Sequence, residues 1–445
     1  MKKVLLVLVG ISMMLPVVAQ QKKDGADIFP DGTPISEWFL QSEPVSINSL
    51  GKKYDLSDYG FISDPNSVQT EKIQAIIDEA AANGGGVICI PEGIYKTGAL
   101  FFKQGTHLHL TRGAILLGSE SILDFPLCMT RIEGETCKFF PALINAENLN
   151  GFTISGSGII DGNGTPYWKA FRLRREWNPK CTNKDEMRPR LVYMSGCRNV
   201  QISGVTLQNS PFWTSHFYQC DSVKILDVRY FAPNKVVRSP STDGIDMDVC
   251  SNFLIKGCQF TLNDDAICFK GGKGPYADKD STNGSVTNVL IEDCLFHDAA
   301  NTCMTCGSEA VHVRNILMRN CRVEGEHSLF RMKMRPDTPQ RYEYITIENI
   351  TGFCKTMLGV GAWEQFFDLK GRKDSPMSYA NNITLRNINL KCDNFISAKK
   401  DDKTYQLSEF LFEDIKVEAS SSKWDKGAFK SIKLKNIIVN EQQHK

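Results

Sequence analysis

A short phrase recurs along the chain at intervals of roughly 22 to 38 residues. It reads CRNVQISGV from Cys197, CDSVKILDV from Cys220 and CSNFLIKGC from Cys250, and looser copies continue as far as Ile437. Self-similarity with this period indicates a solenoid, in which each repeat adds one coil and contacts only its neighbours. Residues 51–445 are therefore expected to form one long domain, although 445 residues would suffice for two or three ordinary domains.

Within each copy of the phrase, apolar and polar residues alternate, as at Val200, Ile202 and Val205. This alternation, together with the many β-branched residues, predicts short strands instead of helices. Each strand is followed by Asn, Asp or Gly, which tolerate the left-handed backbone of a sharp corner. Short strands that are joined by such corners and stacked in register form an all-β fold, the single-stranded parallel β-helix.

The 15 cysteines follow the same repeat. Cys258, Cys294 and Cys321 stand at the phrase position that valine or isoleucine occupies in other copies. We therefore predict that they are buried as small hydrophobic residues in an interior ladder, with unpaired thiols. The alternative is a disulfide framework, which is common in exported proteins.

The first residues have the pattern of a secretory signal. Lys2 and Lys3 precede an apolar run at residues 4–14, and Val17 and Ala19 supply small residues before a cleavage point. Residues 1–19 are thus predicted to be removed, and the protein is expected to be exported to the periplasm or the extracellular space. We expect no membrane insertion, because no other stretch is long and apolar enough to span a bilayer.

The next two segments are expected to lie outside the repeats. Residues 20–50 carry no clear pattern and are predicted to form a leader along the surface. From Thr70, apolar residues recur on one helical face until the glycines at 84–86, which predicts a helix. An amphipathic helix at this place is expected to cap the N-terminal end of the β-helix, where core and strand edges would otherwise be exposed.

The overall charge excludes one class of partner. The chain has 52 Lys and Arg against 51 Asp and Glu, a net charge of +1. Proteins that bind nucleic acid normally carry a basic excess, so no nucleic-acid partner is expected. We expect the protein to be a monomer.

Polar residues gather on successive copies of the repeat, at residues 241–246, 263–266, 306–309 and 331–333. Asp243 and Asp264 are 21 positions apart, about one bare coil, so these two carboxylates and that of Asp265 should lie on neighbouring coils. Repulsion between them raises one pKa and leaves another group ionised, which suits an acid and a base. Arg331 and Lys333 share a strand face and are predicted to hold a substrate carboxylate.

Several of these residues also have a purely structural interpretation. Asp264 and Asp265 are common turn residues, and a pair of them alone says little. Glu309 either contacts substrate, braces Arg331 or caps a turn. Ser241 is a candidate substrate ligand, because its hydroxyl can accept or donate a hydrogen bond.

Two further candidates lie outside these clusters. His216 follows Pro211, Phe212 and Trp213, whose two aromatic rings either line a sugar subsite or belong to the core. Lys270 either extends a positive rim of the site or is simply solvated. Asp246 and Asp248 alternate with apolar residues and are expected to face solvent or the groove.

A charged insertion interrupts the repeats at residues 169–190, with eight basic residues against three acidic ones. It is either a solvated face or a wall at one end of the groove that attracts a polyanion. A wall that blocks the groove predicts action at chain ends, whereas an open groove predicts internal cleavage.

The motifs in order resemble those of family 28 of the glycoside hydrolases, the polygalacturonase and rhamnogalacturonan hydrolase group. The resemblance covers roughly residues 55 to 350. Its motifs are DYG at 58–60, NGGG at 83–86, PEGIYKTGALFF from Pro91, RPRLVYMSGCRNVQISGVTLQNSPFWTSH from Arg188, STDGID at 241–246, NDDA at 263–266, GSE at 307–309 and RMK at 331–333.

This resemblance implies a right-handed parallel β-helix and inverting hydrolysis of α-linked galacturonic acid polymers. Asp264 would be the general acid, Asp243 and Asp265 would activate the water, and Arg331 and Lys333 would bind the uronate carboxylate. Inversion requires the acid and the base to be roughly 6.5 to 9.5 Å apart, which leaves room for the water. Neither a metal nor an organic cofactor is implied, and the substrate would be an acidic plant polysaccharide.

The chain departs from the family pattern at two places. Ser241 stands where the first motif usually begins with Asn. The family also places a Gly-His-Gly group shortly before its Gly-Ser, and here that window, residues 300–303, contains no histidine. His297 and His216 are the candidates to compensate. The missing imidazole suggests an altered subsite, as for a branched pectin or a rhamnose-containing backbone.

Two other functions stay open on the same fold. A polysaccharide lyase would use calcium and a basic side chain, and would yield unsaturated products. A non-catalytic β-helix would bind pectin without producing new reducing ends.

Overall fold

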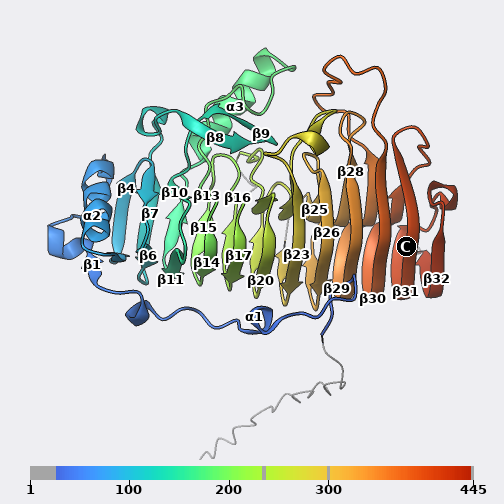
Figure 1. The fold of residues 1–445 in the computed structure, drawn as a ribbon, viewed down its shortest axis with the longest axis horizontal. Coiled ribbons are helices and arrows are strands. Elements are labelled where there is room, and N and C mark those ends of the chain that lie inside the picture. The colour runs from blue at the N-terminus through green and yellow to red at the C-terminus, as the bar shows by residue number, and fades with distance from the viewer. Residues whose placement is uncertain (1–26, 233–236, 298–300, 442–445) are drawn as a thin grey trace, which may run out of the picture.

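The computed structural model describes residues 27–232, 237–297 and 301–441. The predicted secretory signal, residues 1–19, lies outside the described residues, as does the beginning of the leader. In the described part, 30 strands form one parallel sheet that is wound into a right-handed β-helix, and two more strands form an antiparallel hairpin. The predicted fold class is confirmed (Figure 1).

The parallel strands fall into three stacks, each running along the axis of the coil. The first stack has the longest strands. They are β1 (Lys53–Asp55), β3 (Gly86–Ile90), β6 (Thr106–Leu110), β11 (Thr153–Gly156), β14 (Arg198–Ser203), β17 (Asp221–Leu226), β20 (Ser251–Lys256), β23 (Ser285–Glu292), β26 (His312–Arg319), β29 (Arg341–Ala362), β30 (Ser378–Ala398), β31 (Tyr405–Ser421) and β32 (Ile432–Glu441).

The second stack is made of short strands. They are β2 (Asp64–Val68), β4 (Gly93–Thr97), β7 (Ala114–Gly118), β12 (Ile159–Asp161), β15 (Thr206–Gln208), β18 (Arg229–Phe231), β21 (Gln259–Thr261), β24 (Leu295–His297) and β27 (Arg322–Glu324). The third stack carries the site described below. Its strands are β5 (Leu100–Phe102), β10 (Ile144–Glu147), β13 (Val192–Ser195), β16 (Ser215–Tyr218), β19 (Ile245–Asp248), β22 (Ile267–Phe269), β25 (Thr302–Cys306) and β28 (Ser328–Met334).

The corners of the coil depend on residues that accept a left-handed backbone. Asn252, Asn288 and Asn315 occupy one register column of the first stack, with φ of 56°, 57° and 64°. Their side chains form a ladder, since Asn315 donates to Asn288 at 2.8 Å and Asn288 donates to Asn252 at 3.1 Å. Asparagine therefore serves twice at these corners, once through its backbone and once through an amide that links adjacent coils.

Most of the cysteines lie inside the coil. All 15 are free thiols, and Cys258, Cys294 and Cys321 are buried just after the first stack's strands, as the repeat predicted. A second column lies at the beginning of these strands, where the thiols of Cys197 and Cys220 donate to carbonyl groups of the preceding coil at 3.4 Å. These buried thiols thus pack as hydrophobic residues and also make weak hydrogen bonds.

Three α-helices accompany the strands in the described residues: α1 (Glu37–Leu40), α2 (Thr70–Ala82) and α3 (Thr165–Trp177). The helix α2 lies at the N-terminal end of the coil, where Ile73, Ile76, Ile77 and Ala80 are buried in the main core (Figure 1). The insertion predicted at residues 169–190 contains most of α3. None of the helices in the described residues is long and apolar enough to cross a membrane.

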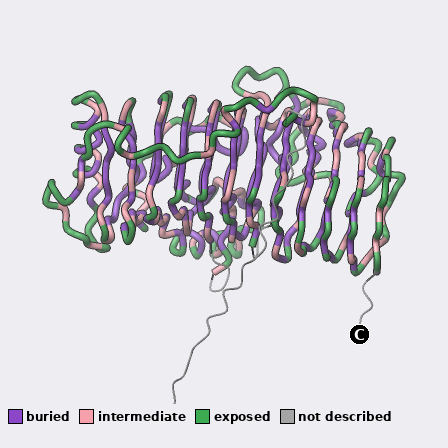
Figure 2. The backbone as a smooth tube through the Cα atoms, turned by 90° about the horizontal axis from the view of Figure 1, so that it is seen from below, coloured by how far each residue is buried: buried purple, intermediate pink, exposed green. Residues whose placement is uncertain are grey.

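The leader runs along the outside of the first stack, against the direction in which the coils are added (Figures 1 and 2). Phe29, Ile35 and Phe39 are buried against the outward-facing side chains of four leucines, Leu226, Leu254, Leu290 and Leu317. At its two ends it is held by polar contacts, between Asp27 and Arg319 at 3.1 Å and between the Val45 N–H and the Gln201 side chain at 2.6 Å. The leader therefore covers leucines that the alternation of the strands directs toward solvent.

Candidate active site

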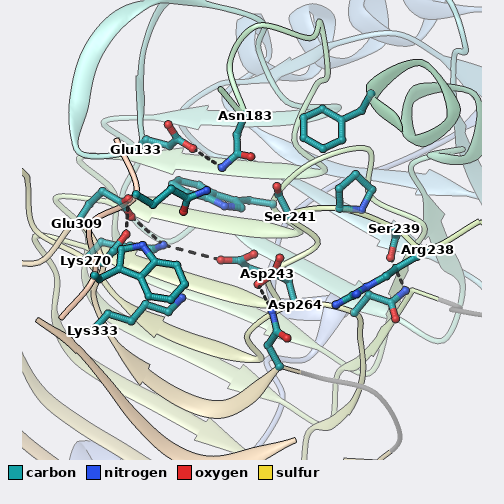
Figure 3. A pocket seen from close by; sticks show the side chains of 18 of the residues that line it. Glu133, Asn183, Arg238, Ser239, Ser241, Asp243, Asp264, Lys270, Glu309 and Lys333 are labelled. Carbon is teal, nitrogen blue, oxygen red and sulfur yellow. Dashed lines mark hydrogen bonds and ion pairs between the residues drawn. The ribbon is translucent and has the colours of Figure 1, made fainter. Parts of the chain in front are cut away.

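A pocket of about 310 Å³ opens on the third stack, at the turns that precede β19, β22 and β25 and along β28 (Figure 3). Its floor carries carboxylates, one side carries cations from β28, and the opposite side is formed by α3 and by the hairpin of β8 (Cys128–Ile132) and β9 (Glu135–Phe139). The pocket is far more polar than an ordinary apolar ligand cavity. Its chemistry therefore suits a charged, hydroxyl-rich ligand.

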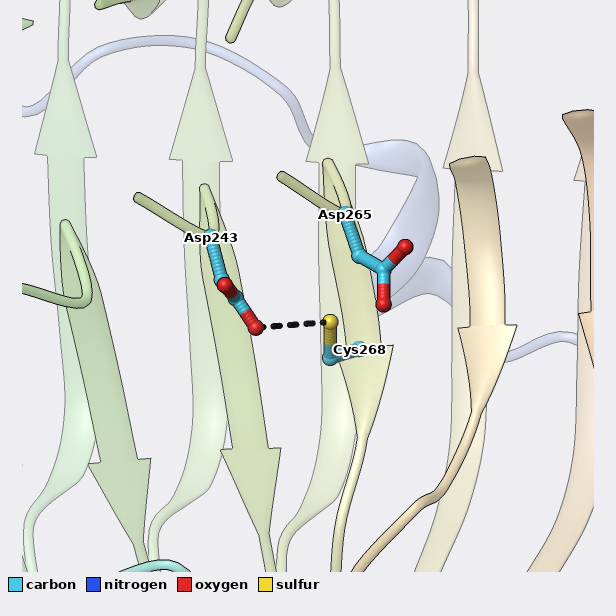
Figure 4. A group of neighbouring side chains, drawn as sticks. All are labelled: Asp243, Asp265 and Cys268. Atoms are coloured by element: carbon cyan, nitrogen blue, oxygen red, sulfur yellow. Dashed lines mark hydrogen bonds between the residues drawn. The ribbon is translucent and has the colours of Figure 1, made fainter. Parts of the chain in front are cut away.

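The predicted carboxylates lie side by side. Asp243 and Asp265 each stand two residues before the paired positions Ile245 and Ile267, so they occupy the same register position on adjacent coils. Their nearest carboxylate oxygens are within 4.8 Å of each other (Figure 4). Gly244 allows this approach, because a Cβ there would lie 2.5 Å from the carbonyl oxygen of Ala266. Asp264 lies beside them and lines the pocket.

The environment separates the pKa values of these carboxyl groups. Burial and the neighbouring charge of Asp265 raise the pKa of Asp264. Burial and the charge of Asp264 raise the pKa of Asp243 well above its ordinary value. Burial also disfavours the ionised form of Asp265, but the Lys333 ammonium at 2.6 Å outweighs this and lowers the pKa. A proton is thus favoured on Asp264 and Asp243, and Asp265 is held ionised.

Lys270 lies in the wall of the pocket and is 4% exposed, so it is neither a solvated lysine nor part of an outer rim. Its ammonium is 3.3 Å from Glu309, 3.4 Å from Asp246 and 3.8 Å from Asp243. Burial lowers the pKa of Lys270, but these carboxylates together raise it well above its ordinary value. Glu309 pairs with this lysine instead of bracing Arg331. Burial alone would raise the pKa of Glu309, but the charge of Lys270 outweighs it and the pKa is lowered.

Arg331 and Lys333 project from β28 into the pocket, as the spacing predicted. Both lie over the ring of Trp363, the Arg331 guanidinium at 5.6 Å and the Lys333 ammonium at 4.8 Å from its centre. Lys333 is already paired with Asp265, whereas Arg331 forms no ion pair among the described residues. Arg331 is therefore the better placed of the two to receive an anionic ligand.

The charged insertion forms a wall of the pocket. Phe171, Arg172 and Arg175 from α3 line it, together with Asn183 from the loop that follows. Asn183 donates at 2.9 Å to Glu133, which stands in the turn between β8 and β9. Of the two alternatives predicted for the insertion, a solvated face or a wall of the groove, the structure shows the wall.

Sequence reasoning missed six lining residues, Glu133, Arg238, Ser239, Pro240, Trp363 and Gln365. All six lie in loops between strands, where no repeat marks them. The only signal for Glu133 was its position in a Glu-Gly turn, and that signal is weak.

His216 does not line the pocket, in contrast to its predicted contact with substrate. Its side chain is fully buried, its Nδ1 is 2.6 Å from Arg190, and its ring packs edge-on against Trp213, which does line the pocket. Burial lowers the pKa of His216 to about 4, so the ring is neutral. Ser241 lies in the lining as predicted.

Asp246 and Asp248 are fully buried, so the expectation that they face solvent or the groove is wrong. Asp248 forms an ion pair at 2.9 Å with Arg131 of strand β8, and both side chains are buried. The hairpin covers the outward face of the third stack here, and this pair fastens it. Asp248 therefore positions the strand that leads to Glu133.

One group of side chains has the composition of a metal site. Oxygens of Asp243 and Asp265 and the thiol of Cys268 lie within 4.8 Å of one another (Figure 4). However, Lys333 and Lys270 already lie against the two carboxylates. Burial and Asp243 raise the pKa of the Cys268 thiol well above its ordinary value, so the thiol is neutral. A neutral thiol is a poor metal ligand, and calcium in particular prefers oxygen ligands. These residues do not fit a metal ion, and the expectation that none is required stays a prediction.

A family model and the sequences of known proteins place the chain in the same family. The family model described as "Glycosyl hydrolases family 28" matches residues 127–433. A probable polygalacturonase of Vitis vinifera is 31% identical over 243 residues, 53% of this chain and 47% of that protein. An exo-poly-alpha-D-galacturonosidase of Dickeya chrysanthemi is 26% identical over 295 residues, 57% of this chain and 47% of that protein. The chain thus spans about half the length of these two relatives.

Solved structures agree at the level of the fold. The hyperthermoactive exopolygalacturonase from Thermotoga maritima has a TM-score of 0.67 at 22% identity, covering 87% of this chain and 92% of its own. The polygalacturonase from Erwinia carotovora has a TM-score of 0.66 at 17% identity, covering 85% and 95%.

Proposed function

Because the chain belongs to family 28 of the glycosyl hydrolases, we propose that it hydrolyses α-linked galacturonic acid bonds in an acidic plant polysaccharide with inversion. The observation that carries this proposal is the separation of roles among the adjacent carboxyl groups. Asp264 lines a pocket whose side carries Arg331 and Lys333, and its pKa is raised, whereas the pKa of the adjacent, buried Asp265 is lowered. These are the properties needed for an acid, a base and a uronate-binding site.

In the proposed reaction, Asp264 gives its proton to the glycosidic oxygen as the bond between that oxygen and the anomeric carbon breaks. A water molecule attacks the same carbon from the opposite face and loses a proton to Asp265. Asp243 lies beside Asp265 and is proposed to help hold this water through its carbonyl oxygen, which accepts a hydrogen bond even when the carboxyl group is protonated. One water is consumed, and proton exchange with solvent returns Asp264 and Asp265 to their starting forms.

A lyase on this fold is less well supported. It would need a base that removes a proton from carbon, and the nearby candidates are arginines and lysines. The guanidinium groups of arginines stay charged in proteins. Burial alone would lower the pKa values of the lysines, but the neighbouring carboxylates raise the pKa of both Lys270 and Lys333. Both therefore stay protonated and are poor bases.

We propose that Arg331 binds the substrate carboxylate. Replacing it by methionine, as Arg331→Met, is expected to raise KM for galacturonan about 10- to 100-fold, since a charge-assisted hydrogen bond is lost. Steady-state kinetics on galacturonan and on its methyl ester measure this. On the ester the two enzymes should differ much less, because the ester carries no charge.

Arg229→Met is the matched control for this substitution. Arg229 is exposed on β18 of the second stack and lies over the Phe231 ring at 5.0 Å, away from the pocket. It should leave KM unchanged. An unchanged KM for Arg331→Met on galacturonan would exclude the proposed contact.

We further propose that the enzyme works from chain ends, because α3 and the β8–β9 hairpin wall the pocket on one side. Incubation with homogalacturonan is then expected to release galacturonic acid from the start, with little loss of viscosity. Nuclear magnetic resonance of the fresh product should show the inverted anomer.

Other outcomes of this experiment assign a different function. A rapid fall in viscosity with mixed oligomers would mean internal cleavage, and products absorbing in the ultraviolet would mean a lyase. Binding without new reducing ends would mean a non-catalytic protein. Parallel incubation with both types of rhamnogalacturonan tests whether a rhamnose-containing backbone is preferred.

The setting of this activity is part of the proposal. Residues 1–19 would be removed on export, and residues 51–445 would act as a single monomeric catalytic domain in the periplasm or outside the cell. The pattern of a basic start, a short apolar run and small residues before Gln20 supports export.

A further inference from the structure

Asp264 is held at one of its two carboxyl oxygens. Its Oδ1 accepts the backbone N–H of Asp265 at 3.0 Å and the side-chain amide of Asn301 at 3.2 Å. Asn301 is fixed in turn, because its backbone N–H donates to the carbonyl of Asp264 at 3.2 Å and its carbonyl accepts the N–H of Ser328 at 3.0 Å. Asn301 therefore bridges the coil of Asp264 and the coil of β28.

We propose that Asn301 is the positioning residue for Asp264, and that it directs the transferable proton to Oδ2. An oxygen that already accepts two N–H groups is disfavoured as the site of an O–H group, because the hydrogens would then face each other. The other oxygen consequently carries the proton that goes to the glycosidic oxygen. This inference rests on the proposed function, in which Asp264 is the general acid.

Asn301 falls within the window where the resembled family carries its histidine. No histidine lines the pocket among the described residues, and His216 is fully buried with its Nδ1 against Arg190. His297 lies on β24 of the second stack, which does not line the pocket. An amide supplies an N–H donor as an imidazole does, but it neither gains nor loses a proton in the working range of pH.

The charged groups that face Asp264 are Asp243, Asp265, Lys333 and Arg188. They come from the turns before β19 and β22, from β28 and from the segment before β13. Asn301 adds no charge to this set. Substitutions that change its charge or remove its donor should therefore shift the titration of Asp264 in a predictable order.

The test is a series of variants at this position, with kcat and kcat/KM on galacturonan measured against pH. Activity falls as pH rises through the pKa of the general acid, so a higher pKa moves this basic limb upward. Asn301→Ala loses a donor to the ionised form and should move the limb up, with kcat about 10-fold lower. Asn301→Asp also adds a negative charge and should move it further, by about one pH unit or more.

Asn301→His restores an N–H donor and is cationic at acid pH. It should move the limb below that of the wild type and recover part of the kcat lost in Asn301→Ala. Gln74→Ala is the control, since it removes another amide-to-carboxylate hydrogen bond, to Asp78 on α2 at the far end of the coil. It should leave the pH profile unchanged.

The inference is supported if the pH of the basic limb rises in the order Asn301→His, wild type, Asn301→Ala and Asn301→Asp. Basic limbs that coincide in all variants would overturn it, because a purely structural role of Asn301 does not change the pKa of Asp264. A change confined to KM would overturn it as well, because this is what a contact with substrate alone predicts. A wild-type protein that releases no product would instead contradict the proposed function. If Asn301→Asp does not fold, the His and Ala variants still place limbs on opposite sides of the wild type.

Discussion

Replacing Asp264 by asparagine is expected to lower kcat on galacturonan by about 10³-fold, with little change in KM. The amide has nearly the same shape as the carboxyl group but cannot give a proton to the glycosidic oxygen. The loss should therefore depend on how much the leaving group needs that proton. An aryl α-galacturonide with an acidic phenol leaves without protonation, so Asp264→Asn should keep most of its activity on this substrate.

This pair of substrates separates a chemical defect from a folding defect. A misfolded variant loses both activities together, and a variant that lacks only the acid loses one. Full activity of Asp264→Asn on galacturonan would contradict the assignment of the general acid. Equal losses on the two substrates, in a variant with wild-type thermal stability, would contradict it as well.

Replacing Lys270 by methionine is expected to lower the free energy of unfolding by about 3–5 kcal/mol and to abolish most activity. The ammonium of Lys270 is the shared partner of Glu309, Asp246 and Asp243, and all four side chains are buried. Without it, three carboxyl groups lie together in a desolvated site. Either Glu309 and Asp246 stay ionised at a cost in stability, or they take up protons, and Asp243 loses the cation that lies against its carboxyl group.

The effect should depend on pH in a stated direction. Despite burial, Lys270 lowers the pKa of Glu309, so this pair stabilises the fold at pH values above the unfolded pKa of Glu309 and loses that contribution as pH falls. Burial raises the pKa of Asp246 to about 7 even with Lys270 in place. The deficit of Lys270→Met should therefore be larger at pH 7.5 than at pH 5, where the unpaired carboxyls are more readily protonated.

Urea unfolding at both pH values measures this deficit, and Lys256→Met is the control. Lys256 also pairs with a carboxylate, Glu292 at 3.0 Å, but a third of its side chain is exposed. Its loss should cost about 1 kcal/mol or less. In the double variant Lys270→Met with Glu309→Gln, part of the stability should return. A small deficit that is equal at both pH values would contradict a buried charge cluster.

The architecture was predictable because a solenoid is nearly one-dimensional. Each coil meets only the coils before and after it, so a repeating phrase places its residues in register without knowledge of distant contacts. For this reason the column of Cys258, Cys294 and Cys321 and the adjacency of Asp243 and Asp265 follow from position in the phrase. The strand of Arg331 and Lys333 is placed by the same rule.

What lies outside the coil was not predictable in this way. Alternation indicates that Asp246, Asp248 and His216 face outward on the third stack, which is correct for the coil alone. The β8–β9 hairpin and α3 then cover that face, so these outward-facing side chains are buried and form a polar layer beneath the pocket wall. Glu133 and Trp363 belong to loops without a repeat, and no local pattern brings them to the pocket.

The leader determines the order in which the molecule can be completed. A chain made from its N-terminus presents residues 27–45 early, yet their binding surface is formed by coils that come much later. Asp27 meets Arg319 across 292 positions, and Val45 meets Gln201 across 156. The earliest described residues can therefore complete their contacts only after the coil that contains β26 has formed. Until then, the apolar side chains of Phe29, Ile35 and Phe39 lack the leucines that bury them.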